Sequence, residues 1–146
     1  MEPTLPDPVV SHDHGRNLLK ECVKHVKEVQ SHSPAIYICD RDGYIKFYNN
    51  AAVMLWGRKP EIGKDLWCGS YKIFAPDGTP TSFDDCPMAK SMREGISIRG
   101  EEILIERPDG RRINVMPHPD PILDSNGEVV GAINILVELT QHQETY

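Results

Sequence analysis

The chain has 146 residues, a formal net charge of −6 and a sequence pI of about 5.5. Its composition, 39% hydrophobic and 26% charged, is typical of a folded globular domain and argues against global disorder. The acidic balance argues against sequence-blind binding to nucleic acid or to an anionic membrane surface, and no apolar run reaches the roughly 18 residues of a membrane span.

The N-terminal sequence MEPTLPDPVV lacks the basic start and apolar stretch of a signal peptide. The cysteines, Cys22, Cys39, Cys68 and Cys86, are therefore expected to be reduced thiols of a cytoplasmic protein. None belongs to a C-x-x-C pair and their spacing matches no zinc framework, so no metal site is expected.

Residues 1–14, rich in proline and acidic side chains, are predicted to be a flexible arm. Residues 15–33 are predicted to hold a flanking amphipathic helix, since Leu19, Cys22, Val26 and Val29 recur at helical spacing. This apolar seam fits packing on the domain's own sheet, and it also fits a dimer interface. We expect the helix to pack partly on the domain's own sheet and partly against a second copy, because two heptads alone make a weak coiled coil.

The next stretch predicts a hairpin followed by a short helix. Ala35–Cys39 and Tyr44–Tyr48 have the composition of strands, and Asp40–Gly43 between them is a turn signal. Asn49 or Asn50 can cap a helix over residues 51–56, which Gly57 would end.

Residues 58–85 are predicted to be largely irregular, with a turn at residues 76–80. Such a long irregular segment is usually functional, and here it is expected to wrap the open face of a sheet. A helix should follow over residues 87–93, with an Asp cap at residues 84–85, Pro87 in its first turn and Gly95 at its end.

Three strands are predicted to complete the domain, over residues 101–107, 112–118 and 129–139. Residues 119–127 are expected to be a connection that ends in an Asn-Gly hairpin signal. Both faces of the last strand are largely apolar, which predicts a central strand covered on both sides.

The order of these elements resembles a PAS domain, the small sensor module of bacterial signalling proteins. The resemblance covers residues 34–140, leaves residues 141–146 as a tail, and lies in ICDRDGYIKFYNNAAVMLWG, RPDGRRINV and NGEVVGAINILVELT. The last motif ends in Glu-Leu-Thr, where the family usually has Asp-Ile-Thr. The middle segment, GKDLWCGSYKIFAPDGTPTSFDDCPMAKSMREG, is similar to a PAS subgroup associated with histidine kinases of two-component systems.

The resemblance implies an α+β fold: a five-stranded antiparallel sheet in the order 2-1-5-4-3, with helices over one face and a flanking helix on the other. It implies a non-enzymatic sensor that binds a small molecule between sheet and helices. Such a module forms a homodimer and passes its signal to an effector such as a histidine kinase. Whether the chain is a stand-alone module or a fragment of a longer sensor stays open.

The expected ligand pocket has aromatic and methionine walls with few polar groups, as suits an apolar or aromatic ligand. Asn134 is a polar residue in an apolar strand, and its buried amide needs partners from a ligand, a neighbouring strand or water. For each residue plain core packing is the alternative. The candidate residues are Trp56, Trp67, Tyr71, Met88, Met92, Met116 and Asn134.

The cofactor is left unknown. Covalent flavin chemistry requires a reactive cysteine on the helix after the second strand, and NNAAVMLWG has none. Haem requires an axial histidine, which residues 84–100 lack, although His118 could face the pocket. Two other functions remain open: a ligand-free protein–protein adaptor, and a thiol redox switch using Cys68 and Cys86, the latter stabilised as a thiolate at a helix N-terminus. A thiol enzyme pairing Cys86 with His118 has least support, since nothing fixes a base beside the thiol.

Overall fold

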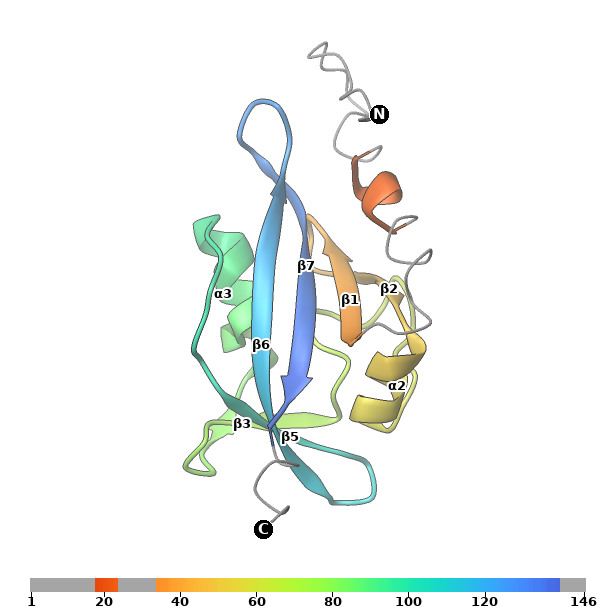
Figure 1. Ribbon diagram of the computed structural model, residues 1–146, viewed down its shortest axis with the longest axis vertical. Coiled ribbons are helices and arrows are strands. Elements are labelled where there is room, and N and C mark those ends of the chain that lie inside the picture. Colours follow the sequence, from red (N-terminus) through yellow and green to blue (C-terminus); the bar gives the residue numbers. More distant parts are fainter. Residues whose placement is uncertain (1–17, 24–33, 140–146) are drawn as a thin grey trace.

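The computed structural model describes residues 18–23 and 34–139. Its core is an antiparallel seven-stranded sheet in the order β2-β1-β7-β6-β5-β3-β4 (Figure 1). The predicted α+β class is confirmed, and so is the predicted order of the five main strands. The prediction of only five strands was wrong, since β3 and β4 extend the sheet beyond β5. The strands are β1 (Ala35–Asp40), β2 (Ile45–Tyr48), β3 (Lys72–Phe74), β4 (Pro80–Thr81), β5 (Ile103–Glu106), β6 (Arg112–Leu123) and β7 (Val129–Glu138).

The β1–β2 hairpin leads directly into α2 (Asn50–Trp56), as the sequence predicts. Asn49 rather than Asn50 is the N-cap: its Oδ1 accepts the N–H of Ala52 at 3.0 Å. Gly57 ends the helix with a φ of 73°.

The two short strands β3 and β4 form a hairpin around residues 76–79, where the sequence predicts a turn. β3 also pairs with β5, which brings the middle segment into the sheet. Strands of three and two residues are too short for an alternating pattern to reveal them.

The helix α3 (Pro87–Glu94) has Pro87 in its first turn, as predicted, but its N-cap is Cys86 and not an Asp. The preceding residues form a separate short 3-10 helix, η2 (Phe83–Asp85). Ser82 caps it by accepting the N–H of Asp84 at 3.2 Å. The predicted Asp cap is therefore wrong because both aspartates lie inside this turn.

The strand β6 continues five residues past the predicted end at His118, through a segment with proline at every second position. In a strand the backbone N–H and C=O of one residue point to the same side, and successive residues point to opposite sides, so that every second residue faces the same way. The carbonyl of Pro119 accepts the N–H of Ile98, so Pro119 faces away from β7, as do Pro117 and Pro121. The prolines therefore remove no donor from the β6–β7 ladder, which is why the strand continues.

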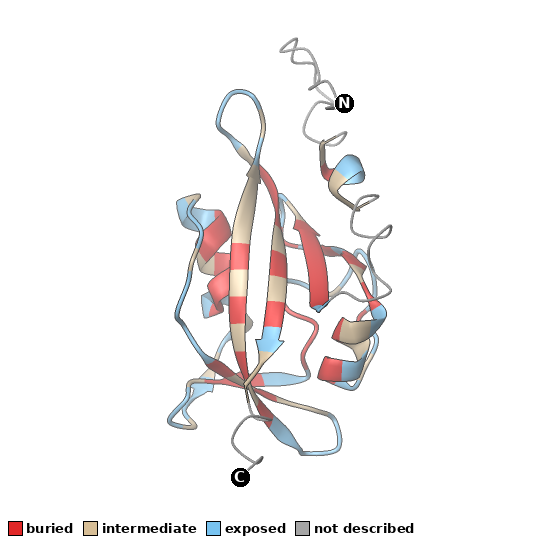
Figure 2. Cartoon of the chain, viewed as in Figure 1, coloured by how far each residue is buried: buried red, intermediate tan, exposed pale blue. Residues whose placement is uncertain are grey.

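The helices cover one face of the sheet: α2 packs on β1, and α3 packs on β6 and β7. The helix of residues 18–23 lies at the opposite face, where Leu19 packs with Ile36, Ile38 and Phe47. Figure 2 shows β1 buried along its length between these layers. The predicted covering of both faces is confirmed for the described residues, whereas Val26 and Val29 lie outside them.

Glycine is required at residue 131 by this packing on the outer face. A Cβ there would lie 2.6 Å from the carbonyl oxygen of Cys39 and 2.9 Å from Cδ1 of Leu19. Within the described ranges, no helix combines the length and apolar character needed to cross a membrane.

Candidate functional site

The space between the sheet and the helices is filled by side chains. Trp56 is fully buried, with the rings of Tyr37 and Tyr48 edge-on at centroid distances of 5.2 and 6.1 Å. A Cβ at Gly69 would lie 2.5 Å from the indole, so only glycine allows this approach. Trp56 therefore occupies the region in which the sequence places a ligand.

The other predicted pocket residues divide between the two faces of the sheet. Met88 and Met92 belong to the same buried core as Trp56. Asn134 is buried on this face, whereas Met116 alternates with the buried Ile113 and Val115 and so lies on the outer face. The structure does not bring these four side chains together into one cavity.

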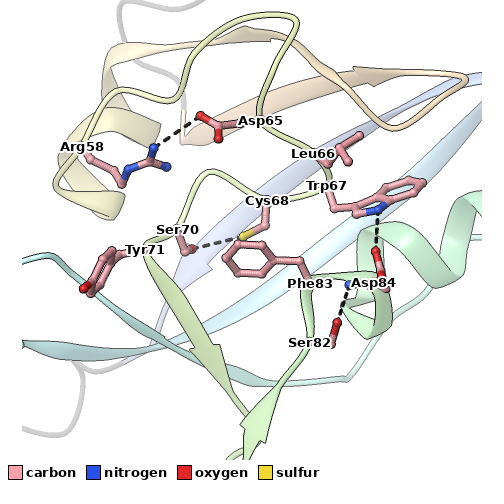
Figure 3. A pocket seen from close by; sticks show the side chains of 10 residues that line it. All are labelled: Arg58, Asp65, Leu66, Trp67, Cys68, Ser70, Tyr71, Ser82, Phe83 and Asp84. Carbon is pink, nitrogen blue, oxygen red and sulfur yellow. Dashed lines mark hydrogen bonds and ion pairs between the residues drawn. The ribbon is translucent and has the colours of Figure 1, made fainter.

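A pocket of about 430 Å³ lies instead between the loop of residues 65–71 and the η2 turn (Figure 3). Two of the residues proposed from the sequence for a ligand pocket, Trp67 and Tyr71, line it, and so does Cys68, which the sequence suggested only as a redox thiol. Sequence reasoning missed its other members, although all of them fall in the long middle segment that was expected to be functional. They are Arg58, Asp65, Leu66, Ser70, Ser82, Phe83 and Asp84.

Four contacts with three residues, Gly43, Asp84 and Tyr37, hold Trp67 in place. Its φ of 64° is the only positive value at a non-glycine residue in the described part of the chain, a conformation that persists only where neighbours impose it. Its N–H donates to the carbonyl of Gly43 at 2.8 Å, and its ring lies directly on Gly43, where a Cβ would come within 2.7 Å. The indole Nε1 donates to Oδ1 of Asp84 at 3.2 Å, and the Trp67 carbonyl accepts the hydroxyl of Tyr37 at 2.6 Å.

This last contact begins a hydrogen-bonded chain that reaches the middle of the sheet. Nδ2 of Asn134 donates to the Tyr37 hydroxyl oxygen at 3.2 Å, and Oδ1 of Asn134 accepts the backbone N–H of His118 at 3.0 Å. The chain thus joins the pocket wall at Trp67 to β1, β7 and β6. It also satisfies the buried amide of Asn134 by protein groups, one of the alternatives that its sequence position left open.

The surroundings of Cys86 and Cys68 favour a neutral thiol over the thiolate that a reactive cysteine needs. Burial, with a smaller contribution from nearby Cys68, raises the pKa of Cys86 to about 12. The N–H groups of Met88 and Ala89 lower that pKa, but by less. The predicted thiolate stabilisation at the helix N-terminus is therefore wrong, because desolvation outweighs the helix dipole. Burial likewise raises the pKa of Cys68, against the opposing hydrogen bond from Ser70 at 3.1 Å.

The raised pKa of Cys86 predicts a loss of stability in alkaline solution. The unfolded thiol ionises near its ordinary pKa of 9.0 and the folded one near 12, so this contribution is complete below pH 9 and is lost as the pH rises towards 12. Between about pH 8 and pH 10 the free energy of unfolding should fall about 1 kcal/mol more for the wild type than for Cys86→Ala. Urea denaturation at both pH values measures this difference. Equal losses in the two proteins would contradict the burial of a neutral thiol.

His118 and Cys86 lie on opposite faces of the sheet. His118 alternates with the buried Pro117 and Pro119, and its Nδ1 lies 3.3 Å from the carbonyl oxygen of Ile135. Cys86 belongs to the core on the helix-covered face. In the ranges that the structure describes, no three His, Cys, Asp or Glu side chains are grouped to hold a metal ion.

A second hollow, of about 570 Å³, lies where α2 meets the ends of β1 and β7. Its lining is mainly apolar and includes Met54, Leu136 and Val137. We take the pocket at Trp67 as the candidate site because it alone of the two brings several fixed polar groups together and connects with the buried hydrogen-bonded chain.

Comparison with solved structures identifies the fold as that of PAS domains. A light-oxygen-voltage domain studied with a flavin analogue is 18% identical, with a TM-score of 0.60 over 82% of this chain and 87% of that one. A PAS domain from Colwellia psychrerythraea is 21% identical, with a TM-score of 0.55 over 85% and 98%. The PAS domain of the fruit-fly ELK potassium channel is 14% identical, with a TM-score of 0.59 over 80% and 95%. No protein-family model and no curated protein matches the sequence.

Proposed function

We propose that this chain is a PAS-type sensory module that binds a small molecule in the pocket at Trp67 and passes its occupancy to the sheet. The observation that carries the proposal is the buried chain of hydrogen bonds from the Trp67 carbonyl through Tyr37 to Asn134. A ligand that contacts the Trp67 ring acts on a residue whose backbone is tied to the centre of the sheet.

The physical mechanism is a shift between two states of this chain of hydrogen bonds. Trp67 keeps its left-handed φ because Gly43, Asp84 and Tyr37 hold it together. A ligand that replaces the Trp67–Asp84 contact favours a state with a different Trp67 position. The equilibrium moves only by the difference in ligand affinity between the two states. Movement of the Tyr37 hydroxyl then shifts the Asn134 side chain. This alters the hydrogen bond that Asn134 accepts from the His118 N–H, where β6 and β7 pair.

The output in this proposal is a homodimer contact or an effector such as a histidine kinase of a two-component system, in the cytoplasm. Support comes from the outer face of the sheet, where Cys22, Ile133 and Ile135 are only partly buried beside Leu19. The formal charge of −6 favours a protein partner over nucleic acid or a membrane. The separation of Cys86 from His118 supports a binding module rather than a thiol enzyme.

A ligand-free protein–protein adaptor is the second candidate function. It is favoured by the filled core, in which Trp56 and Met88 are fully buried where a sensor of this fold was expected to hold its ligand. In an adaptor the pocket at Trp67 would be a surface feature without an occupant.

Native mass spectrometry of the purified protein separates the two candidates. The sensor proposal predicts extra mass on the native species that disappears on denaturation. The variant Ser82→Trp places a large side chain at the pocket and should reduce the bound fraction, whereas the matched change Ser97→Trp, at an exposed position outside the pocket lining, should not. A bare native mass favours the adaptor, and an adduct equally retained by both variants would show that the molecule binds elsewhere.

A further inference from the structure

The charges that line the pocket leave one carboxylate uncompensated. Arg58 and Asp65 form an ion pair at 3.3 Å, and both are held further by the backbone. Nη1 of Arg58 donates to the carbonyl of Gly69 at 2.6 Å, and Oδ2 of Asp65 accepts the N–H of Glu61 at 2.6 Å. These two charges therefore offset each other at one wall of the pocket.

Asp84 stands at the opposite wall (Figure 3). Its Oδ1 accepts the neutral indole N–H of Trp67, and the ion pairs among the described residues include none with its carboxylate. Arg93 approaches this residue from outside the pocket lining, where it donates to the Asp84 backbone carbonyl at 2.8 Å. The pocket lining therefore carries a net charge of one negative unit, located on Asp84.

Aromatic rings supply the rest of the pocket's recognition surface. Trp67, Phe83 and Tyr71 all line it, and the hydrogen bond to Asp84 fixes the Trp67 ring in place. The ammonium of Lys72 already lies 5.3 Å from the centroid of the Tyr71 ring, so this ring accepts a cation in the structure itself. Aromatic faces together with a carboxylate are the groups that hold ammonium ligands in proteins.

We infer that the ligand of this pocket is a small organic cation, an amine or quaternary ammonium compound, bound between the Trp67 and Phe83 rings and the Asp84 carboxylate. The inference rests on the proposed function, because it names the ligand class of the same site. A volume of about 430 Å³ accommodates a molecule of this kind. The cation would compete for the carboxylate that now holds the Trp67 indole.

Three probes of the same shape and different charge test the inference: choline, neutral 3,3-dimethylbutan-1-ol and anionic 3,3-dimethylbutanoate. Binding is followed by the indole N–H resonance of Trp67 in NMR titrations, assigned with the help of Trp56→Phe. Choline should bind about tenfold more tightly than the neutral alcohol, and the anion more weakly than both.

Two variants locate the charge that is responsible. Asp84→Asn keeps an oxygen for the Trp67 indole but removes the charge, and it should bring choline and the alcohol to within about twofold. Asp85→Asn makes the same change in the same η2 turn outside the pocket lining, and it should keep the preference.

Equal or tighter binding of the neutral or anionic probe would overturn the cation class and leave the pocket as a ligand site. Loss of the preference in both variants would overturn it too, because the effect would then come from overall charge. If none of the probes moves the Trp67 resonance, the ligand class and the ligand site of the proposed function both fail.

Discussion

Replacing Trp56 with alanine should lower the free energy of unfolding by about 3–5 kcal/mol, the range seen when a large buried aromatic side chain is truncated. Trp56 is fully buried between Tyr37, Tyr48 and Gly69, so its removal leaves a cavity that these neighbours fill only in part. Part of the loss is offset, because the Trp56 Nε1 is buried without an acceptor among the described residues. Urea denaturation at neutral pH measures the effect.

Met54 supplies the control on the same helix. Its side chain is 71% exposed, so Met54→Ala should change the free energy of unfolding by no more than about 0.5 kcal/mol. A loss below about 1 kcal/mol for Trp56→Ala would show that the indole is not the centre of the core.

Replacing Asn49 with alanine should cost about 2–4 kcal/mol, because one side chain makes three hydrogen bonds. Oδ1 of Asn49 accepts the N–H groups of Ala52 at 3.0 Å and of Ile36 at 3.1 Å, and Nδ2 donates to the carbonyl of Pro34 at 2.8 Å. The first contact caps α2, and the other two fix the start of β1 against that helix. Alanine leaves the buried N–H of Ile36 without this acceptor.

Two further variants separate these contributions, again by urea denaturation. Asn49→Asp keeps an acceptor for both N–H groups but cannot donate to Pro34, so its stability should fall between those of the wild type and Asn49→Ala. Asn50→Ala changes the exposed neighbour that does not cap the helix, and should be nearly neutral. If Asn49→Ala and Asn50→Ala cost the same, the capping assignment is wrong.

The main strands could be predicted because local signals mark them. The Asp-Gly and Asn-Gly turns and the apolar alternation of residues 101–118 specify hairpins wherever the rest of the chain lies. Two features could not be predicted in this way. β4 is too short for a pattern, and the extension of β6 depends on which side of the strand Pro117, Pro119 and Pro121 face. The neighbouring strand determines that side. β7 pairs with backbone N–H donors of β6, so prolines are tolerated only at the positions of β6 that face away from β7.

The candidate site was predicted only in its general region. The middle segment and the residues Trp67 and Tyr71 followed from composition, but Trp56 proved to fill the core rather than line a cavity. Whether an aromatic residue fills a space or borders one depends on small clearances, such as the contact between Trp56 and Gly69, that sequence patterns do not contain. The pairing of Trp67 with Asp84 joins residues 17 positions apart through an irregular segment, which no periodicity could reveal.

The pocket and the sheet are coupled through Tyr37 in the proposed mechanism, and a group tethered in the pocket tests this coupling without knowledge of the natural ligand. Ser82→Cys in a Cys22→Ser background, treated with benzyl methanethiosulfonate, places a benzyl group at the pocket. The buried, protonated thiols Cys39, Cys68 and Cys86 should stay unmodified. Ser97→Cys, exposed and outside the pocket lining, gives the matched control.

The measurement is the change in the NMR resonances of the Asn134 side-chain amide and the His118 backbone amide on attachment of the benzyl group. We expect both resonances to move for the Ser82 tether and to remain in place for the Ser97 tether. Both should stop responding when Tyr37→Phe removes the hydroxyl that links Trp67 to Asn134. Changes confined to the pocket walls, or a response at Asn134 and His118 that survives Tyr37→Phe, would contradict this coupling.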